Sequence, residues 1–205
     1  MKLVVAATDE QWKELTDSRP GIDWQRVNEA GDFLQYKNAD AFFYLNINKV
    51  LPNFSLLKKP VFINAVIETL AELKTPDNVL RINGWATFLQ RRYWEVAGKI
   101  DENIKCLFKK LDIECKPVAD ESGFISARII AMIINEAYFA VNENVSSKNE
   151  IDTAMKLGTN YPYGPFEWAS LIGQKNILEL LLKLNKSGKR YQPAALLIKE
   201  IKDKN

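Results

Sequence analysis

One stretch limits the fold more than any other, because it is apolar on nearly every side if it is helical. From Gly123 to Val141 the sequence reads GFISARIIAMIINEAYFAV, in which isoleucine, alanine, methionine and aromatic residues fall at all positions of the helical turn. A surface helix carries a single apolar stripe with polar residues opposite. We therefore expect a core helix over this stretch, with neighbours all round it.

The residues that follow the core helix predict a set of further helices. Ser147 and Glu150 have the spacing of a capping box, which starts a helix, and Gly158 is expected to end that helix in a left-handed turn. Pro165 suits the first position of a third helix, which Gly173 is expected to end. Later helices are expected over Lys175–Leu184 and from Gln192-Pro193 to the charged end of the chain.

The first part of the chain has the order of elements of an α/β sheet. A helix is expected from Thr8, a capping residue, to about Leu15, and an amphipathic helix over Asp101–Asp112. Val50–Lys59 is interpreted as a connection broken by Pro52. Strands are expected over Lys2–Ala6, Trp24–Val27, Phe33–Tyr36, Ala41–Leu45, Pro60–Val66, Val79–Asn83, the WEV segment at 94–96 and Ile113–Val118.

A strand followed by a capped helix is how a dinucleotide-binding domain begins, but the phosphate fingerprint is missing. That fingerprint, G-x-G-x-x-G, lets the backbone approach a pyrophosphate. No two glycines of this chain are two residues apart, and the expected place reads AATDEQ, residues 6–11. Asp9 and Glu10 would repel a pyrophosphate and already occupy the positive end of the helix dipole. We therefore expect a plain capped helix here.

The composition excludes several classes of function. The 205 residues are 47% apolar, enough for a real core, and the net charge of +2 gives no reason to expect nucleic acid or an anionic membrane as a partner. The chain contains no histidine, which excludes an imidazole base or metal ligand, and its two cysteines are expected to be reduced and buried rather than to bind metal. The start is not that of a signal peptide, so we expect a cytoplasmic location.

Three segments together resemble a known family. NEA, EIDTAMKLG and YPYGPFEWASLIG, preceded by GF and Arg128, are similar to the C-terminal helical domain of the 3-hydroxyacyl-CoA dehydrogenases, NAD-dependent enzymes of fatty-acid β-oxidation. The resemblance implies a shortened, degenerate Rossmann-like α/β domain over residues 1–119 and an all-α domain over residues 120–205. It also implies a homodimer formed through the helical domain.

The resemblance locates the family's catalytic residues in this sequence. The family uses a histidine base, a glutamate twelve residues later that orients it, and an asparagine before the arginine that follows GF. Glu95 matches the glutamate, but Asn83 stands in the place of the histidine and Ala127 in that of the asparagine. An amide has no useful proton affinity near neutral pH. Asn83, Glu95 and Ala127 are thus the candidates for a vestigial cleft, and we expect neither cofactor nor metal, although NAD serves the family.

Three functional hypotheses stay open. The first is a family member that has lost NAD-dependent dehydrogenase activity and retains either a cleft for an acyl-CoA-type molecule or a role in dimerisation and regulation. The second is an active NAD(P)-dependent dehydrogenase with unusual coenzyme contacts. The third is a structural subunit that partners an active dehydrogenase. Arg128 and Asn135, which lie on one line of the core helix, are expected to tie it to the sheet domain.

Overall fold

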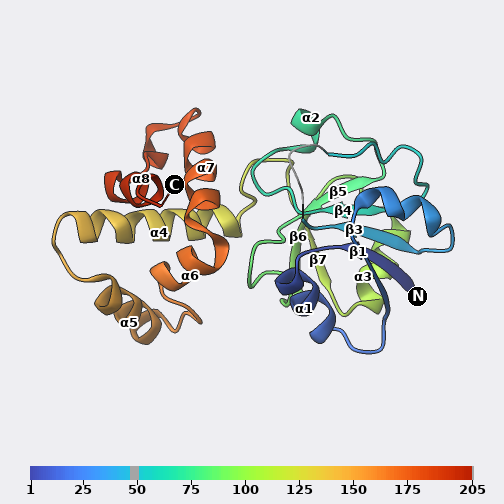
Figure 1. Ribbon diagram of the computed structural model, residues 1–205, viewed down its shortest axis with the longest axis horizontal. Helices are drawn as coiled ribbons and strands as arrows, with labels where there is room; N and C mark the ends of the chain where they lie inside the picture. The colour runs from blue at the N-terminus through green and yellow to red at the C-terminus, as the bar shows by residue number, and fades with distance from the viewer. Residues whose placement is uncertain (47–50, 205) are drawn as a thin grey trace. The chain divides into compact units, whose positions relative to one another are not determined.

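The computed structural model describes residues 1–46 and 51–204 and divides into two compact units (Figure 1). Residues 1–124 form a sheet unit, and residues 125–205 form a helical unit. The boundary proposed from the sequence followed residue 119. Val50, the first residue of the connection expected before β4, lies outside the described residues. No helix of the described ranges has both the length and the apolar character needed to cross a membrane.

In the part of the sheet unit that the structure describes, seven strands form a mostly parallel sheet. Their spatial order is β2-β1-β3-β4-β5-β6-β7; β6 runs antiparallel to β5, and β7 runs parallel to β6. The order reverses between β1 and β3, as in a Rossmann-like sheet. The strands are β1 (Lys2–Ala6), β2 (Asp23–Val27), β3 (Ala41–Tyr44), β4 (Val61–Ile63), β5 (Val79–Ile82), β6 (Tyr93–Ala97) and β7 (Glu114–Pro117).

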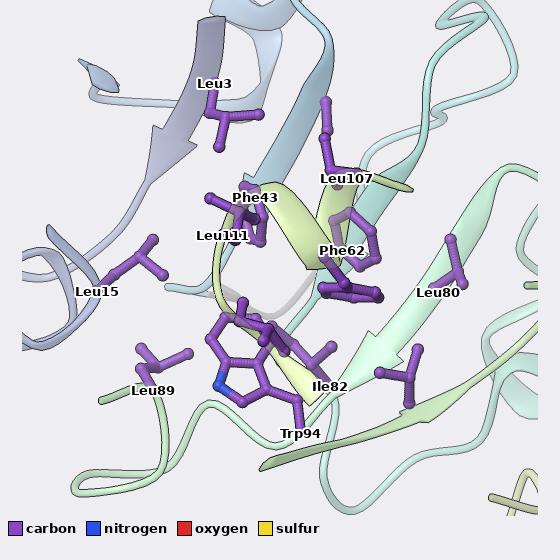
Figure 2. Close-up of a cluster of buried hydrophobic side chains, with 14 of the residues drawn as sticks. Leu3, Leu15, Phe43, Phe62, Leu80, Ile82, Leu89, Trp94, Leu107 and Leu111 are labelled. Carbon is purple, nitrogen blue, oxygen red and sulfur yellow. The ribbon is translucent and has the colours of Figure 1, made fainter. Parts of the chain in front are cut away.

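Helices cover one face of the sheet. α1 (Asp9–Asp17) contributes Leu15 to this face, and α3 (Glu102–Lys110) contributes Leu107. Alternate strand residues such as Phe43 point into the same cluster, as the period of two along a strand requires. Figure 2 shows these side chains converging, with Trp94 of β6 closing the cluster near Leu89.

The other face is covered by shorter segments: a 3-10 helix, η1 (Ala30–Gln35), the connection before β4, and the one-turn helix α2 (Leu70–Leu73). The strand expected over Phe33–Tyr36 is therefore wrong. Phe33 is fully buried and its ring lies 5.0 Å from that of Phe42, so the chain must fold inward here instead of extending along the sheet. In a 3-10 helix the side chains at i and i+3 lie on the same side, and the buried residues of η1, Ala30 and Phe33, are three apart.

Residues 125–204 of the helical unit form six helical segments. They are α4 (Ser126–Asn142), α5 (Lys148–Thr159), α6 (Pro165–Ile172), α7 (Gln174–Asn185), η2 (Lys189–Tyr191) and α8 (Ala195–Lys202). α4 is the central helix, which packs against α5, α6, α7 and α8 and buries Ile134 and Tyr138. Its expected burial on every side is wrong at its start, because Ile125 is 59% exposed and Ile129 is 53% exposed.

The helix signals read from the sequence are confirmed with two exceptions, of which one is that α8 begins at Ala195 and not at Gln192-Pro193. Ser147 and Glu150 form the capping box of α5, Pro165 opens α6 and Gly173 ends it. Gly158, however, does not end α5. The helix continues to Thr159, and Asn160 takes the left-handed conformation with φ 56°. Asparagine tolerates this conformation because its short side chain bonds locally, so it replaces glycine at the helix end.

The two cysteines are both free, as expected, but they differ in exposure. Cys115 is half-buried, and burial raises the pKa of its thiol. Cys106 is exposed on α3, so the expectation that both would be buried is wrong. It lies on the side of α3 that faces away from the buried Leu107 and Phe108.

Candidate functional site

The carboxyl ends of five parallel strands lie at one edge of the sheet. They are β2, β1, β3, β4 and β5, and the strand order reverses between β1 and β3. In open α/β sheets the ligand crevice lies outside this edge, at the reversal. Side-chain amides follow the three neighbouring strands beyond the reversal, namely Asn46 after β3, Asn64 after β4 and Asn83 after β5.

The start of α1, which faces this edge, is satisfied by its own side chains. Thr8 Oγ1 accepts a hydrogen bond from the Gln11 backbone N–H at 3.3 Å, and Gln11 Oε1 accepts one from the Thr8 N–H at 3.1 Å. Arg26 pairs with Asp9 at 2.7 Å and also donates to the carbonyl of Ala7 at 3.0 Å. The turn between β1 and α1 is thereby fixed from both sides.

Gln11 also reaches across the edge. Its Nε2 donates to the carbonyl of Leu45, after β3, at 3.0 Å and to that of Gly84, after β5, at 3.3 Å. Asn64 lies between them, donating to Leu45 O at 3.1 Å and accepting from the Gly84 N–H at 2.9 Å. A Cβ atom at Gly84 would lie 2.7 Å from Asn64 Cγ, so this close approach requires glycine.

The segment that follows β5 is held against α1 and the turn after it. Glu14 Oε1 accepts from the Thr87 N–H at 2.7 Å, and the Arg19 guanidinium donates to the carbonyls of Leu89 and Arg91 at 2.8 and 2.9 Å. Burial raises the pKa of Glu14 and lowers that of Arg19 to about 10. Thr87 has φ 75°, a strained value for a β-branched residue, which this surrounding bonding maintains.

The structure brings together two of the three residues that the resemblance singled out. Arg81 pairs with Ala97 and Ile82 with Val96 across β5 and β6, so continuing this antiparallel register by one step places Asn83 opposite Glu95. Asn83 is buried, and its Oδ1 accepts from the Trp85 N–H at 3.2 Å. Asn83 and Glu95, which the resemblance matched to the family's base and orienting glutamate, therefore lie side by side on the continued register.

Ala127, the third residue, belongs to the helical unit and is fully buried in α4. A methyl group offers neither a donor nor an acceptor to a reacting oxygen. Asn135, expected to tie the core helix to the sheet domain, instead forms hydrogen bonds within the helical unit. Its Nδ2 donates to Gln192 O at 2.9 Å and its Oδ1 accepts from the Ala194 N–H at 2.8 Å, so it joins α4 to the start of α8.

The residues at the carboxyl edge do not fit a nicotinamide dinucleotide. Thr8 and Gln11 stand at the second and third glycine positions of the fingerprint, where a backbone must approach the pyrophosphate and pack closely on the strand. Their side chains already engage N–H groups at the start of α1. Two carboxylates, Asp9 and Glu10, lie in the first turn of the helix and oppose a phosphate.

Sequence reasoning identified Asn83 and Glu95 but missed the role of Gln11. The spacing of Thr8 and Gln11 is that of a capping box, so the hydrogen bonds between these two residues could be predicted from the sequence. The bonds from Gln11 to Leu45 and Gly84 span 34 and 73 residues, and no local pattern indicates them. Within the described residues, no group of three or more His, Cys, Asp or Glu side chains is placed to hold a metal ion.

Comparison with known proteins gives a family match for one part of the chain. The model of the 3-hydroxyacyl-CoA dehydrogenase C-terminal domain matches residues 123–204. The 3-hydroxyadipyl-CoA dehydrogenase of Escherichia coli is 48% identical over 82 residues, which are 39% of this chain and 17% of that protein. A probable 3-hydroxybutyryl-CoA dehydrogenase of Deinococcus radiodurans is 31% identical over 144 residues, 69% of this chain and 44% of that protein.

The sheet unit shares its fold with solved structures. The (S)-3-hydroxybutyryl-CoA dehydrogenase of Ralstonia eutropha aligns with a TM-score of 0.69 at 21% identity, covering 88% of this chain and 70% of that one. The chain spans less than half the length of the curated relatives cited above. Residues 123–204 therefore form a domain of the 3-hydroxyacyl-CoA dehydrogenase C-terminal type. The likeness to the solved structure shows that the chain shares the fold of that dehydrogenase, with a Rossmann-like N-terminal unit.

Proposed function

We propose that this chain is a cytoplasmic family member without nicotinamide-dependent dehydrogenase activity, which acts through its helical unit as a homodimer and holds an acyl-CoA-type molecule of fatty-acid metabolism. The observation that carries the proposal is Asn83, an amide at the position of the family's base and opposite Glu95 on the continued sheet register. The chain contains no histidine that could act in its place. A general base contributes roughly 10²- to 10⁴-fold to a rate.

The test is a direct assay of the family reaction. Purified protein is mixed with NAD and 3-hydroxybutyryl-CoA, and the absorbance of reduced coenzyme is followed beside an active family dehydrogenase. We expect no reduced coenzyme, since Asn83 cannot take the hydroxyl proton. A Glu95→Gln variant is the matched control. Steady coenzyme reduction that disappears in this variant would show that Glu95 works as a base and would contradict the proposal.

The proposed dimer rests on the exposed start of α4. Ile125 and Ile129 are four residues apart on one side of the helix, and the half-buried Met132 continues the same side. Light scattering in reducing buffer should give the mass of a dimer, and Ile129→Asp should give a monomer. Leu157→Asp, on α5 and 82% exposed, is the control that should stay dimeric. A monomeric parent protein would remove this part of the proposal.

The proposed ligand is tested with acetoacetyl-CoA as the probe. Isothermal titration calorimetry should show saturable binding of acetoacetyl-CoA. Separate titrations with free coenzyme A and with acetate distinguish recognition of the nucleotide from recognition of the acyl group. Absence of heat at millimolar acetoacetyl-CoA would leave dimerisation or a structural partnership with an active dehydrogenase as the role of the helical unit. Co-purification with such a dehydrogenase from a mixture of the two proteins would support the partnership.

An active NAD(P)-dependent dehydrogenase with unusual coenzyme contacts is the second candidate, favoured by the retained Glu95 and by the dehydrogenases among the relatives. Coenzyme that binds the native state raises the free energy of unfolding by about 2.7 kcal/mol at 100 times its dissociation constant. Thermal unfolding with and without NAD(H) and NADP(H) therefore separates the two candidates. A midpoint that does not move at millimolar coenzyme removes the second.

A further inference from the structure

We propose that the carboxamide of Gln11 is an internal ligand of the Rossmann-like edge: it ties the ends of β3 and β5 to the start of α1 and so closes the crevice in which sheets of this topology hold a dinucleotide. The inference deepens the proposed function and rests on it. It concerns binding at the sheet edge, however, and not the missing base.

The first step in the argument is the position of Gln11. It follows β1 by five residues, where the third glycine of the fingerprint packs the helix closely on the strand. A glutamine there adds a side chain long enough to leave the helix. Its Oε1 binds the Thr8 N–H, which fixes the carboxamide so that Nε2 points along the edge.

The second step is what the two Nε2 hydrogens do. One donates to Leu45 O at 3.0 Å and the other to Gly84 O at 3.3 Å, so a single amide joins two strand ends that are separated by β4. Asn64, at the end of β4, binds the same two residues from the middle, through Leu45 O and the Gly84 N–H. All three neighbouring strand ends are thus connected by side-chain amides.

The third step is that these bonds lie at the reversal of strand order. β1 and β3 are the neighbours between which the crevice opens, and Gln11 connects the helix that follows β1 to the residue that follows β3. A dinucleotide lying across the edge would have to break that connection. It would gain no phosphate-binding loop in exchange, because Thr8 Oγ1 already accepts the Gln11 N–H.

The segment after β5 closes the edge further. Gln11 and Glu14 of α1, and Arg19 just beyond it, all bind the backbone of residues 84–91. The Arg19 guanidinium also lies 4.9 Å from the Trp94 ring, which anchors it in the core. This segment therefore follows α1 rather than standing away from it.

The charged side chains at the edge also oppose binding of a dinucleotide. Asp9 is paired with Arg26, whose guanidinium also lies 5.7 Å from the Trp12 ring, so that cation is already engaged. Glu10 and Glu14 add carboxylates along the same helix. A pyrophosphate would meet acidic side chains where nucleotide-binding sheets offer free backbone N–H groups.

The test combines ligand binding with local hydrogen exchange on the full chain. Wild-type protein is titrated with ADP-ribose and with NAD to millimolar concentration, and the thermal midpoint is measured. We expect no shift with either. Gln11→Ala should lower the midpoint and speed amide exchange around Leu45 and Gly84 about tenfold or more, since the carbonyls of both residues lose the hydrogen bond from Gln11.

Gln35→Ala is the matched control, because this exposed glutamine in η1 donates to the neighbouring side chain of Asp32 and lies away from the sheet edge. It should leave both exchange and midpoint unchanged. Exchange that is the same in Gln11→Ala as in wild type would overturn the proposal. Gln11→Glu, which keeps the size but loses both donors, checks that a fall in midpoint reflects the lost hydrogen bonds and not the lost volume.

The outcomes also separate this inference from the proposed function. A saturable shift of the wild-type midpoint by ADP-ribose, without coenzyme reduction in the assay, overturns the closed edge and leaves the loss of activity standing. A shift together with coenzyme reduction overturns both. Unchanged exchange in Gln11→Ala with no shift overturns only the role of Gln11.

Discussion

Asp120 is the partner of a buried arginine, and replacing it with asparagine should destabilise the sheet unit strongly. Arg81, in β5, is fully buried; its Nη1 lies 2.8 Å from Asp120 Oδ1, and its Nη2 donates to Glu121 O at 2.9 Å. The guanidinium also stacks 4.6 Å from the Phe124 ring. Burial lowers the pKa of Arg81, yet the group remains charged near neutral pH.

The magnitude follows from what the substitution leaves behind. Asp120→Asn keeps the size and one acceptor but removes the charge that compensates Arg81. Removing one partner of a buried ion pair costs about 3–5 kcal/mol because the other charge stays buried and unpaired. The Asp120 side chain is 28% exposed, so water relieves part of the loss and we expect about 3 kcal/mol. That is a large part of the stability of a typical domain.

Urea unfolding followed by tryptophan fluorescence measures the effect, because four of the five tryptophans lie in the sheet unit. Asp112→Asn is the control. The Asp112 side chain is 83% exposed and that of its partner Arg92, at 3.5 Å, is 64% exposed, so loss of this ion pair should cost less than about 1 kcal/mol. Adding Arg81→Met to Asp120→Asn should recover stability by removing the stranded charge. A cost for Asp120→Asn no larger than the control, or no recovery in the double variant, would refute the reasoning.

Three further predictions concern single residues. The raised pKa of Glu14 means that its contribution to stability is full below about 4.5 and is lost as pH rises through the raised value, so Glu14→Gln should flatten the fall in urea midpoint as the pH rises above about 4.5. Gly158→Ala should raise the free energy of unfolding by about 0.5–1 kcal/mol, and with it the thermal midpoint, since the glycine is inside α5 with nothing within 4 Å of an added Cβ. A lower midpoint would contradict the helix end at Asn160. Asn135→Ala should cost about 2–3 kcal/mol in urea, because it strands the Ala194 N–H; a loss under 1 kcal/mol would contradict this account.

Local chemistry made much of the fold predictable. Thr8, Ser147 and Pro165 start helices for reasons contained within four residues of sequence, and all three do so in the structure. The strand expected over Phe33–Tyr36 is wrong because Phe33 is buried against Phe42, a residue of a later strand, and this contact favours a 3-10 helix. The helix end expected at Gly158 is wrong because Asn160, two residues later, ends α5 instead.

The candidate site divides in the same way. The twelve-residue spacing of Asn83 and Glu95 is a pattern in sequence, and the register of β5 and β6 carries it into space. The reach of Gln11 to Gly84 depends on how strands distant in the chain are ordered in the sheet, which a local pattern does not contain. Residues that act through long-range backbone contacts are therefore those that the sequence reading missed.

The exposed thiol of Cys106 has a practical consequence for any mass measurement on this protein. It sits on α3, in the sheet unit, whereas the expected association surface is at the start of α4. Air oxidation would join two molecules through α3 and produce a covalent pair of the same mass as the proposed dimer. A pair that survives a non-reducing gel and disappears with thiol would thus come from oxidation, and Cys106→Ser removes it without altering the proposed association surface at the start of α4.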